Sequence, residues 1–334
     1  MASGQRIAVV GATGAVGQTT LKILEQRNFP IRELRAYASA RSAGKTVEFR
    51  GEKIPVTVLD ANAFQGIDIV LFSAGSEQSR EFAPIAVKAG AIVVDKSNAF
   101  RMDPDVPLVV PEINGAAARK HQGIVACPNC TTIVTVMPLK PLHDAGGLKR
   151  VIATSFQAVS GAGVNGVAEL REQTLAWARG EEIKPTVFQH RIAFNVIPHI
   201  DKFTEGGYTN EEMKLVNEVR KILDLPELAI SATTVRVPVF TAHSISVNAE
   251  TDRRVGAAGA RAAFERFPGL RVCDDPAAKR YPMPIVAEGQ DECFVGRIRD
   301  DLGCANAVNF WVSGDQLRKG AALNGVQIAE LLIS

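Results

Sequence analysis

The fold of this chain is decided by residues 6–27, RIAVVGATGAVGQTTLKILEQR. A short β-branched run, Arg6–Val10, comes first, and apolar residues then recur at helical spacing from Gln18 to Arg27. Between them the loop at 11–17 has glycines in the spacing G-x-x-G-x-x-G. Glycines in a strand-to-helix loop let the backbone approach a pyrophosphate held at the helix N-terminus. The segment predicts the start of a nucleotide-binding domain, the alternative being a tight turn without a ligand.

Strand and helix patterns alternate through the rest of the first third of the chain. Strands are expected at Leu34–Ala38, Asp68–Ser73, Ala91–Asp95, Leu108–Val110 and Ile124–Cys127, with a helix at Glu77–Lys88. Such repetition predicts an α/β fold with a parallel, doubly wound (Rossmann) sheet. The last segment, Gln316–Leu332, has the pattern of an amphipathic helix that returns to this domain, because isolated terminal helices rarely persist. We therefore assign residues 1–129 and 315–334 to the first domain.

Beyond Gly146 and Gly147 the expected strands become longer and alternate between apolar and polar residues. Strands are expected at Val151–Val159, Thr233–Phe240, Ser244–Thr251, Phe294–Arg299 and Ala307–Ser313, and helices at Val164–Arg179 and Asn210–Leu223. Alternation of this kind favours a mixed or antiparallel sheet with one covered face. Residues 130–314 are thus predicted to form a second, α+β domain with a mixed sheet.

The composition is that of an ordinary globular protein. Apolar residues make up 46% of the chain and charged residues 22%, and the 38 basic and 36 acidic residues are interspersed. No basic block would attract a phosphate backbone, so nucleic acid is not an expected partner. The most apolar long stretch, Ile124–Leu142, is interrupted by prolines and polar residues, so no membrane span is expected either.

The ends of the chain and its cysteines bear on the compartment. Met1–Arg6 contains no basic region followed by an apolar core, so no export signal is expected and a cytoplasmic location is predicted. Five cysteines, an odd number, do not suggest a framework of disulfides, which agrees with a reducing environment.

The residues after the second expected strand indicate which nucleotide would bind. A carboxylate is expected there when the cofactor has a free ribose hydroxyl, but the chain has Ser39-Ala40-Arg41-Ser42. A serine and an arginine would instead bind a 2′-phosphate. The sequence favours NADP over NAD, the alternative being that Arg41 is a solvated cation of the loop.

Cys130 is the candidate nucleophile. It lies in the run Cys127-Pro128-Asn129-Cys130-Thr131-Thr132, where an apolar strand gives way to a segment that can be helical as far as His143. The amides and the dipole at a helix N-terminus favour the thiolate. A buried structural thiol, a redox pair with Cys127 and half of a zinc site are the other interpretations. Zinc needs four ligands and the remaining cysteines are scattered, so no metal site is predicted.

A nucleophilic thiol needs a proton partner, and the chain has five histidines. His243 comes just after the run Val235-Arg236-Val237-Pro238-Val239, in which Arg236 points away from the valines. Both side chains can therefore face one cleft. Taken alone, an isolated histidine is more often a surface or core residue.

Several motifs lie in register along the chain. Besides the glycine loop they are SNAFR at 97–101, PNCTT at 128–132, SFQAVSGAG at 155–163, EEMK at 211–214, Arg236-x6-His243, NFWV at 309–312 and DQLRKG at 315–320. Together they resemble the motifs of the aspartate-semialdehyde dehydrogenase family. The resemblance runs nearly end to end, and its motifs together are highly specific. It implies NADPH-dependent reductive dephosphorylation of L-aspartyl 4-phosphate to L-aspartate 4-semialdehyde, on the route to lysine, diaminopimelate, methionine and threonine. It also implies a homodimer or a tetramer, with the second domain serving catalysis and dimerisation.

The resemblance assigns roles to individual side chains. The Cys130 thiolate would attack the acyl carbonyl, Gln157 would orient the intermediate and His243 would manage the proton. Five residues are implied in substrate binding: Arg101 and Lys214 for the phosphate, Glu211 near the amino group, Arg236 for the α-carboxylate, and Asn129, to which no particular group is assigned. Without the resemblance, the cations among them would be read as surface salt-bridge partners.

The resemblance also implies which residues contact NADP. They lie in the glycine loop, in the loop after the second strand and at three later positions near the nicotinamide. They are Gly11, Thr13, Gly14, Ala15, Val16, Ser39, Ala40, Arg41, Ser160, Gly161 and Gln316.

Two rival functions stay open at this point. N-acetyl-γ-glutamyl-phosphate reductases use the same acyl-phosphate chemistry but have Pro-Gly-Cys where this chain has Pro-Asn-Cys. A non-catalytic nucleotide-binding paralogue should lose its nucleophile or the proton partner, whereas Cys130 and His243 are both present. Cys127 departs from the family, which more often has asparagine there, and it raises the hypothesis of an oxidative bond between Cys127 and Cys130.

Overall fold

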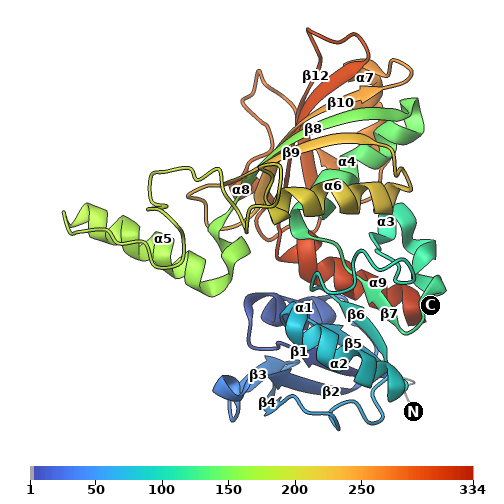
Figure 1. Cartoon of the computed structure of the whole chain (residues 1–334), viewed down its shortest axis with the longest axis vertical. Helices are drawn as coiled ribbons and strands as arrows, with labels where there is room; N and C mark the ends of the chain where they lie inside the picture. Colours follow the sequence, from blue (N-terminus) through green and yellow to red (C-terminus); the bar gives the residue numbers. More distant parts are fainter. Residues whose placement is uncertain (1–3, 334) are drawn as a thin grey trace. The chain divides into compact units, whose positions relative to one another are not determined.

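The computed structural model describes residues 4–333 (Figure 1). The chain divides into two compact units, Met1–Asn129 together with Ala321–Ser334, and Cys130–Gly320. Each unit is built on its own sheet, one of them mostly parallel and the other mixed. The expected α/β architecture, with a doubly wound sheet and a second α+β region, is confirmed.

The boundary near the C-terminus differs from the expected one. Residues 315–320 belong to the second unit, although we expected the returning segment to include them. Hydrogen bonds explain the difference. Asp315 Oδ2 accepts from the amide of Gly289 at 2.8 Å, and Gln316 Oε1 accepts from the amide of Ala242 at 2.6 Å. These bonds hold the start of the segment to the second unit.

The sheet of the first unit has seven strands. In chain order they are β1 (Gln5–Val10), β2 (Ile31–Ala38), β3 (Thr46–Phe49), β4 (Glu52–Val58), β5 (Ile69–Phe72), β6 (Ile92–Asp95) and β7 (Ile124–Ala126). Their spatial order is β3-β4-β2-β1-β5-β6-β7, and only the β3–β4 hairpin is antiparallel. The chain runs to one side of β1 and later resumes on the other side at β5. In doubly wound sheets, ligands bind outside the carboxyl ends of the strands at such a switch point.

The glycine loop follows β1 and therefore lies at the switch point. Gly11 has a φ of 79°, and an added Cβ would lie 2.5 Å from the carbonyl oxygen of Ser73, the residue after β5. A Cβ on Gly17 would lie 2.2 Å from the carbonyl oxygen of Gly11. On Gly14 it would meet only that same oxygen, at 3.4 Å. Packing of the loop requires Gly11 and Gly17, whereas the missing side chain at Gly14 leaves room for a ligand.

The helices of the first unit are α1 (Ala15–Gln26), α2 (Ser76–Lys88), α3 (Pro111–Asn114) and α9 (Leu323–Ile333), with short 3-10 turns η1 (Ala40–Ser42) and η2 (Gly115–Lys120). Two expectations were wrong. The C-terminal helix begins at Leu323 rather than Gln316, after a π-type turn, η4 (Arg318–Ala322). Leu108 makes only an isolated bridge instead of starting a strand, because Asn324 Nδ2 donates to the carbonyl of Val109 at 2.9 Å.

The second unit contains a six-stranded sheet. Its strands are β8 (Leu148–Gln157), β9 (Ala229–Arg236), β10 (His243–Thr251), β11 (Leu270–Val272), β12 (Cys293–Asp300) and β13 (Ala307–Gly314). They are ordered β11-β12-β13-β10-β8-β9; β8 is parallel to β9 and antiparallel to β10. β9 ends at Arg236 instead of the expected Phe240, since Pro238 has no amide hydrogen for the ladder.

Helices of the second unit are α4 (Cys130–Gly146), α5 (Gly163–Ala178), α6 (Asn210–Leu223), α7 (Gly256–Arg266) and α8 (Pro284–Ala287), with the 3-10 turn η3 (Val159–Ala162). α4 is buried along most of its length and packs on β8, β10 and β13. α6 begins at a capping box in which Glu212 Oε2 accepts from the amide of Thr209 at 2.7 Å. This cap fixes the first turn of α6.

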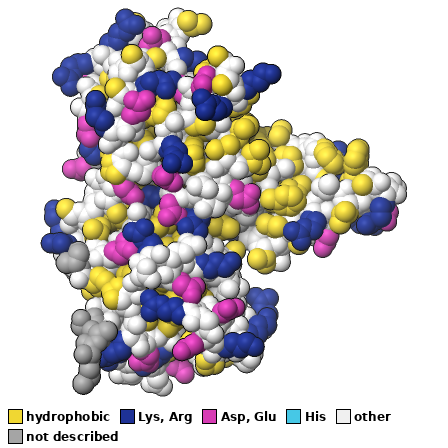
Figure 2. Space-filling view, turned by 180° about the vertical axis from the view of Figure 1, so that it is seen from behind, with side chains coloured by type: hydrophobic (Ala, Val, Ile, Leu, Met, Phe, Trp, Pro, Cys, Tyr) yellow, Lys and Arg dark blue, Asp and Glu magenta, His cyan; other side chains and the backbone are white. Residues whose placement is uncertain are grey.

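α5 and the segment after it extend from the sheet of the second unit (Figure 1). Hydrophobic side chains gather over this extension in the space-filling view (Figure 2). Across residues 4–333, no helix is both long enough and apolar enough to pass through a bilayer.

Candidate active site

Three candidate residues meet at one edge of the second sheet. β8 lies between β9 and β10, and it ends at Gln157 where its parallel neighbour β9 ends at Arg236. β10 runs the other way, so it begins at the same edge, with His243 as its first residue. The strand order therefore brings together side chains that are far apart in the sequence.

Arg236 is held in a buried position, with only 7% of its surface exposed. Its Nη1 donates to the carbonyl of Ala158 at 2.7 Å, and the guanidinium carbon lies 5.8 Å from the ring centroid of Phe188. Burial lowers the pKa of Arg236, and the nearby Glu211 carboxylate and Cys130 thiol oppose that shift. A desolvated guanidinium beside the candidate nucleophile is suited to bind an anionic group of a substrate.

His243 is fully buried. Its Nδ1 accepts a hydrogen bond from the amide of Ala158 at 3.1 Å, and its Nε2 has no hydrogen-bond partner among residues 4–333. Burial, and secondarily the charge of Arg236, lowers the pKa of His243 to about 3. The ring is thus neutral near pH 7, and the bond to Nδ1 leaves its proton on Nε2.

A chain of polar contacts runs from Gln157 to α6. Gln157 Nε2 donates to Glu211 Oε1 at 3.3 Å, and Lys214 Nζ donates to Glu211 Oε2 at 3.1 Å. Lys214 also donates to Asp201 Oδ2 at 2.7 Å. Burial lowers the pKa of Lys214, but the two carboxylates outweigh it and leave the pKa raised. Lys214 therefore stays a cation beside the buried carboxylate of Glu211.

Cys130 is the first residue of α4, and its side chain is partly exposed. The N-terminal amides of a helix have no partners within the helix, and they favour negative charge nearby. Gly320 packs on the cysteine, because an added Cβ there would lie 3.1 Å from Cys130 Cβ. The structure thus places the thiol at a helix N-terminus, in the electrostatic neighbourhood of Arg236.

Ser160, Gly161 and Gln316 come from the turn after β8 and the segment after β13. Gln316 Nε2 donates to Ser160 Oγ, and both residues are buried. A Cβ on Gly161 would lie 2.7 Å from Arg236 Nη1 and 3.3 Å from His243 Nε2. The backbone of Gly161 is therefore in close contact with Arg236 and His243.

The other candidates belong to the first unit. Arg101 is 7% exposed and is held by two carbonyls, with Nε 3.0 Å from the oxygen of Cys127 and Nη2 2.8 Å from the oxygen of Lys96. Asn129 is 8% exposed. Cys127 is fully buried, and Asn324 Nδ2 lies 3.3 Å from its sulfur. Its oxidative pairing with the nucleophile stays a prediction.

The cofactor candidates of the first unit lie around the glycine loop. Ala15 and Val16 form the first turn of α1. Thr13 Oγ1 and Ser42 Oγ are 3.1 Å apart, which ties the loop to η1. The side chains of Ser39, Ala40 and Arg41 are exposed, and within residues 4–333 the guanidinium of Arg41 has no ion pair. The arrangement presents an unpaired cation next to a loop that is shaped for a pyrophosphate.

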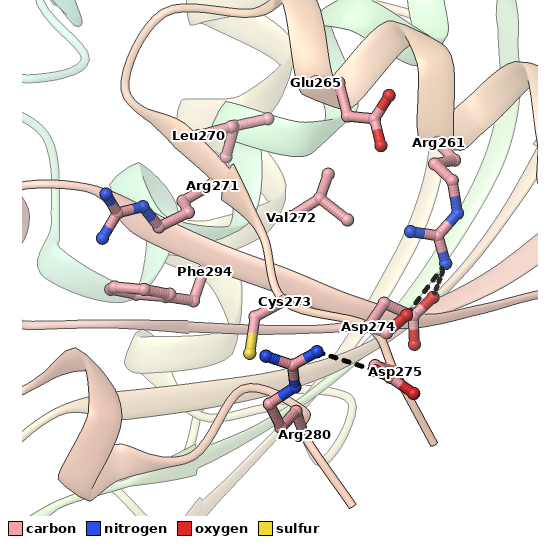
Figure 3. A pocket seen from close by; sticks show the side chains of 10 residues that line it. All are labelled: Arg261, Glu265, Leu270, Arg271, Val272, Cys273, Asp274, Asp275, Arg280 and Phe294. Carbon is pink, nitrogen blue, oxygen red and sulfur yellow. Dashed lines mark hydrogen bonds and ion pairs between the residues drawn. The ribbon is translucent and has the colours of Figure 1, made fainter. Parts of the chain in front are cut away.

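A separate hollow of about 540 Å³ lies against β11 and α7 in the second unit (Figure 3). Two of its arginines are paired with its aspartates: Arg261 pairs with Asp274, and Arg280 with Asp275 at 2.8 Å. None of the candidate site residues lines this hollow. We do not connect it with the chemistry, because its charges largely neutralise one another.

The structure adds two participants to which the sequence analysis gives no role. Asp201 fixes Lys214 from outside α6, and the backbone of Ala158 bonds both Arg236 and His243. Ala158 has no side-chain chemistry, so only its position after β8 makes it important.

Comparison with known proteins places the chain in a family. Two family models match, "Semialdehyde dehydrogenase, NAD binding domain" over residues 6–121 and "Semialdehyde dehydrogenase, dimerisation domain" over residues 139–319. The aspartate-semialdehyde dehydrogenase of Aquifex aeolicus is 52% identical over 334 residues, covering 99% of this chain and 98% of its own. The chain belongs to the aspartate-semialdehyde dehydrogenase family.

Other members agree. The Bacillus subtilis aspartate-semialdehyde dehydrogenase is 49% identical, with 99% of this chain and 98% of its own covered. A crystal structure of aspartate semialdehyde dehydrogenase II from Vibrio cholerae, complexed with ASA, is 42% identical with a TM-score of 0.95, covering 99% of this chain and 98% of that one. Family membership confirms the resemblance drawn from the motifs and the assignment as an oxidoreductase; neither rival function is favoured.

The environment of His243 predicts a pH dependence of stability. The folded state resists protonation of this ring until about pH 3, whereas the unfolded chain takes up the proton near 6.5, the ordinary pKa of a histidine. Below that value the unfolded state binds more protons, so this contribution to stability is lost as the pH falls. Urea unfolding between about pH 6.5 and 4 should show a free energy that falls more steeply, by up to about 1.4 kcal/mol per pH unit, than in His243→Gln. Parallel curves for the two proteins would contradict the lowered pKa of His243 in the folded state.

Proposed function

We propose that this enzyme reduces L-aspartyl 4-phosphate to L-aspartate 4-semialdehyde with NADPH, through a thioester on Cys130. The observation that supports it most is the edge where β8 and β9 end and β10 begins. There a buried guanidinium and a neutral, buried histidine with an unpartnered Nε2 accompany a cysteine that starts a helix. A nucleophile, an anion clamp and a proton carrier are the parts that acyl transfer to a thiol requires.

The residues act in a definite order in this proposal. The Cys130 sulfur bonds to the acyl carbon, and the carbon–phosphate oxygen bond breaks with release of phosphate. The nicotinamide, when bound, supplies the hydride that converts the thioester into a thiohemiacetal. Cleavage of the carbon–sulfur bond then gives the aldehyde and restores the thiolate.

His243 serves the oxygen of these intermediates. Because Nδ1 is occupied by the amide of Ala158, only Nε2–H is available to the substrate. A neutral donor there can hydrogen-bond the oxyanion as it forms and hold the proton until the carbon–sulfur bond breaks. Gln157, fixed by Glu211 and by Ser155 Oγ at 3.3 Å, would orient the same intermediate.

The charges of the candidate side chains match those of the proposed substrate. Arg236 offers a planar fork to the α-carboxylate, and the carboxylate of Glu211 suits the α-ammonium group. Lys214 and Arg101 would bind the phosphate, with Asn129 as a neutral partner. A doubly charged phosphate and two cations are matched in this assignment.

NADP is the proposed cofactor. The loop after β2 has no carboxylate to bind a ribose 2′-hydroxyl, and Arg41 stands there exposed and without an ion pair in the described part of the chain. The bond between Thr13 and Ser42 keeps this loop beside the glycine loop. A 2′-phosphate would supply the missing partner of Arg41.

A homodimer is the proposed assembly, and it could associate further into a tetramer. Large apolar side chains are exposed along α5 and the segment after it: Val164 64%, Leu175 50%, Trp177 58%, Phe194 56%, Val196 57% and Phe203 59%. Hydrophobic side chains gather over this extension in Figure 2, and we call these six residues the apolar patch. Apolar surface of this kind is typical of a protein interface.

We also propose a cytoplasmic location. A thiolate nucleophile and an odd number of cysteines suit a reducing compartment. The substrates are small, charged metabolites, and neither nucleic acid nor a membrane has a role in the proposed reaction.

The decisive test is phosphate-dependent reduction of NADP with aspartate semialdehyde. Cys130→Ser should lower the rate by about a thousandfold or more, because a serine hydroxyl is far less ionised than a thiol. Cys304→Ser, on the connection between β12 and β13, is the matched control and should keep full activity. Equal rates in Cys130→Ser and the unchanged enzyme would refute the mechanism.

Arg41 is predicted to determine cofactor preference. Arg41→Ala should raise the KM for NADP about tenfold or more and leave the KM for NAD nearly unchanged, as expected for one lost bond to a charged phosphate. Arg32→Ala, an exposed arginine at the start of β2, provides the control. A preference for NAD in the unchanged enzyme would contradict the proposal.

The apolar patch is predicted to hold two copies together. Light scattering should give a mass of at least twice 35.8 kDa for the unchanged protein, and Trp177→Glu should shift it toward the monomer. Leu302→Glu alters a fully exposed leucine outside the patch and should not change the mass. A monomeric unchanged protein at micromolar concentration would show that the patch has another purpose.

A further inference from the structure

Lys96 is a half-buried lysine to which the proposed mechanism gives no role. It follows β6, the strand that ends at Asp95. Its Nζ lies 3.2 Å from Thr20 Oγ1 and 3.2 Å from Ser73 Oγ, two uncharged acceptors. Its stem packs on α9, because a Cβ added to Gly325 would lie 2.5 Å from Lys96 Cε. The ammonium is enclosed by elements of the first unit.

The position is costly for a cation. Burial lowers the pKa of Lys96 to about 8, and the charges of Cys127 and Asp95 only partly oppose this effect. The Asp95 carboxylate is itself engaged, since it accepts from Ser79 Oγ at 2.8 Å and from Ser97 Oγ at 2.7 Å. An apolar side chain of similar length would fill the same space without the desolvation penalty. A role in packing alone therefore does not explain a lysine here.

The two acceptors show what the ammonium connects. Ser73 follows β5, and its backbone is in contact with Gly11 of the glycine loop. Thr20 lies on α1, the helix that the glycine loop begins, and its hydroxyl donates to the carbonyl of Val16 at 2.8 Å. The Lys96 ammonium thus connects the loop after β5 with helix α1, next to the switch point.

The backbone of Lys96 makes two further hydrogen bonds. Its carbonyl accepts from Arg101 Nη2 at 2.8 Å, and its amide donates to the carbonyl of Phe72 at 3.1 Å. The residue is therefore fixed to β5 through its backbone and to Ser73 and Thr20 through its side chain.

We propose that Lys96 is a positioning residue for the nucleotide site, in which its ammonium locks the loop after β5 and helix α1 into the spacing that the pyrophosphate requires. The inference rests on the proposed function, since it concerns the same cofactor site. Lys96 does not touch the reacting atoms; it acts through Ser73 and Thr20. Its loss should weaken cofactor binding and leave the chemical step intact.

The test is NADPH binding to the intact enzyme, measured through the quenching or enhancement of NADPH fluorescence. Lys96→Met keeps the length of the stem and removes the ammonium, and it should raise the Kd about tenfold, the effect of losing a hydrogen bond from a charged group. Lys22→Met, an exposed lysine on α1, is the matched control and should leave the Kd unchanged. In steady state, Lys96→Met should raise the KM for NADP with kcat within about twofold.

A measurement of thermal stability distinguishes a positioning role of Lys96 from a purely structural one. Removing a partly desolvated charge should leave the Tm of Lys96→Met at or above that of the unchanged enzyme. Ser73→Ala keeps the lysine and removes one acceptor, so it should also weaken NADPH binding, and the double variant should be no weaker than Lys96→Met. Should Lys96→Met fail to fold, Ser73→Ala alone decides.

The outcomes are distinct. A Kd within about twofold of the unchanged enzyme in both variants, or a lower Tm with unchanged binding, overturns the role of Lys96. Failure of the unchanged enzyme to bind NADPH overturns the proposed cofactor, and this inference with it. Weaker binding in both variants, with intact Tm and kcat, supports it.

Discussion

The backbone of Ala158 is the point on which the candidate site of the second unit depends. Its carbonyl accepts from Arg236 and its amide donates to His243, so a single residue holds the two side chains proposed as anion clamp and proton carrier. The arrangement follows from strand order. Because β8 lies between a parallel and an antiparallel neighbour, the residue after β8 is adjacent to the end of β9 and the start of β10.

That geometry also sets the electrostatics. Both side chains are removed from water, which favours the neutral form of the histidine and opposes the charge on the arginine. A buried guanidinium keeps its charge at neutral pH because its ordinary pKa is so high. The site thus pairs a fixed cation with a neutral donor, and that pairing suits an anionic substrate whose reacting oxygen becomes negative only transiently.

The first unit applies a different constraint. At the switch point the backbone at Gly11 and Ser73 approaches so closely that no side chain fits between them. Such close packing restricts the conformation of the loop. The Lys96 ammonium contacts Ser73 and Thr20 in the same region.

The sequence by itself determined the fold class and a candidate nucleophile. Periodicity located β1, α1 and α6, and the position of Cys130 before a helical segment pointed to a thiolate, because these features depend on local spacing and on side-chain chemistry. The roles of Arg236 and His243 were implied only by the resemblance of the motifs to the family. It placed the end of β9 and the start of α9 wrongly, since a proline and hydrogen bonds to distant residues set those limits. Only the tertiary structure decided that Ala158, Asp201 and Lys96 matter. Their importance comes from partners far away in the chain, and no local pattern records such partners.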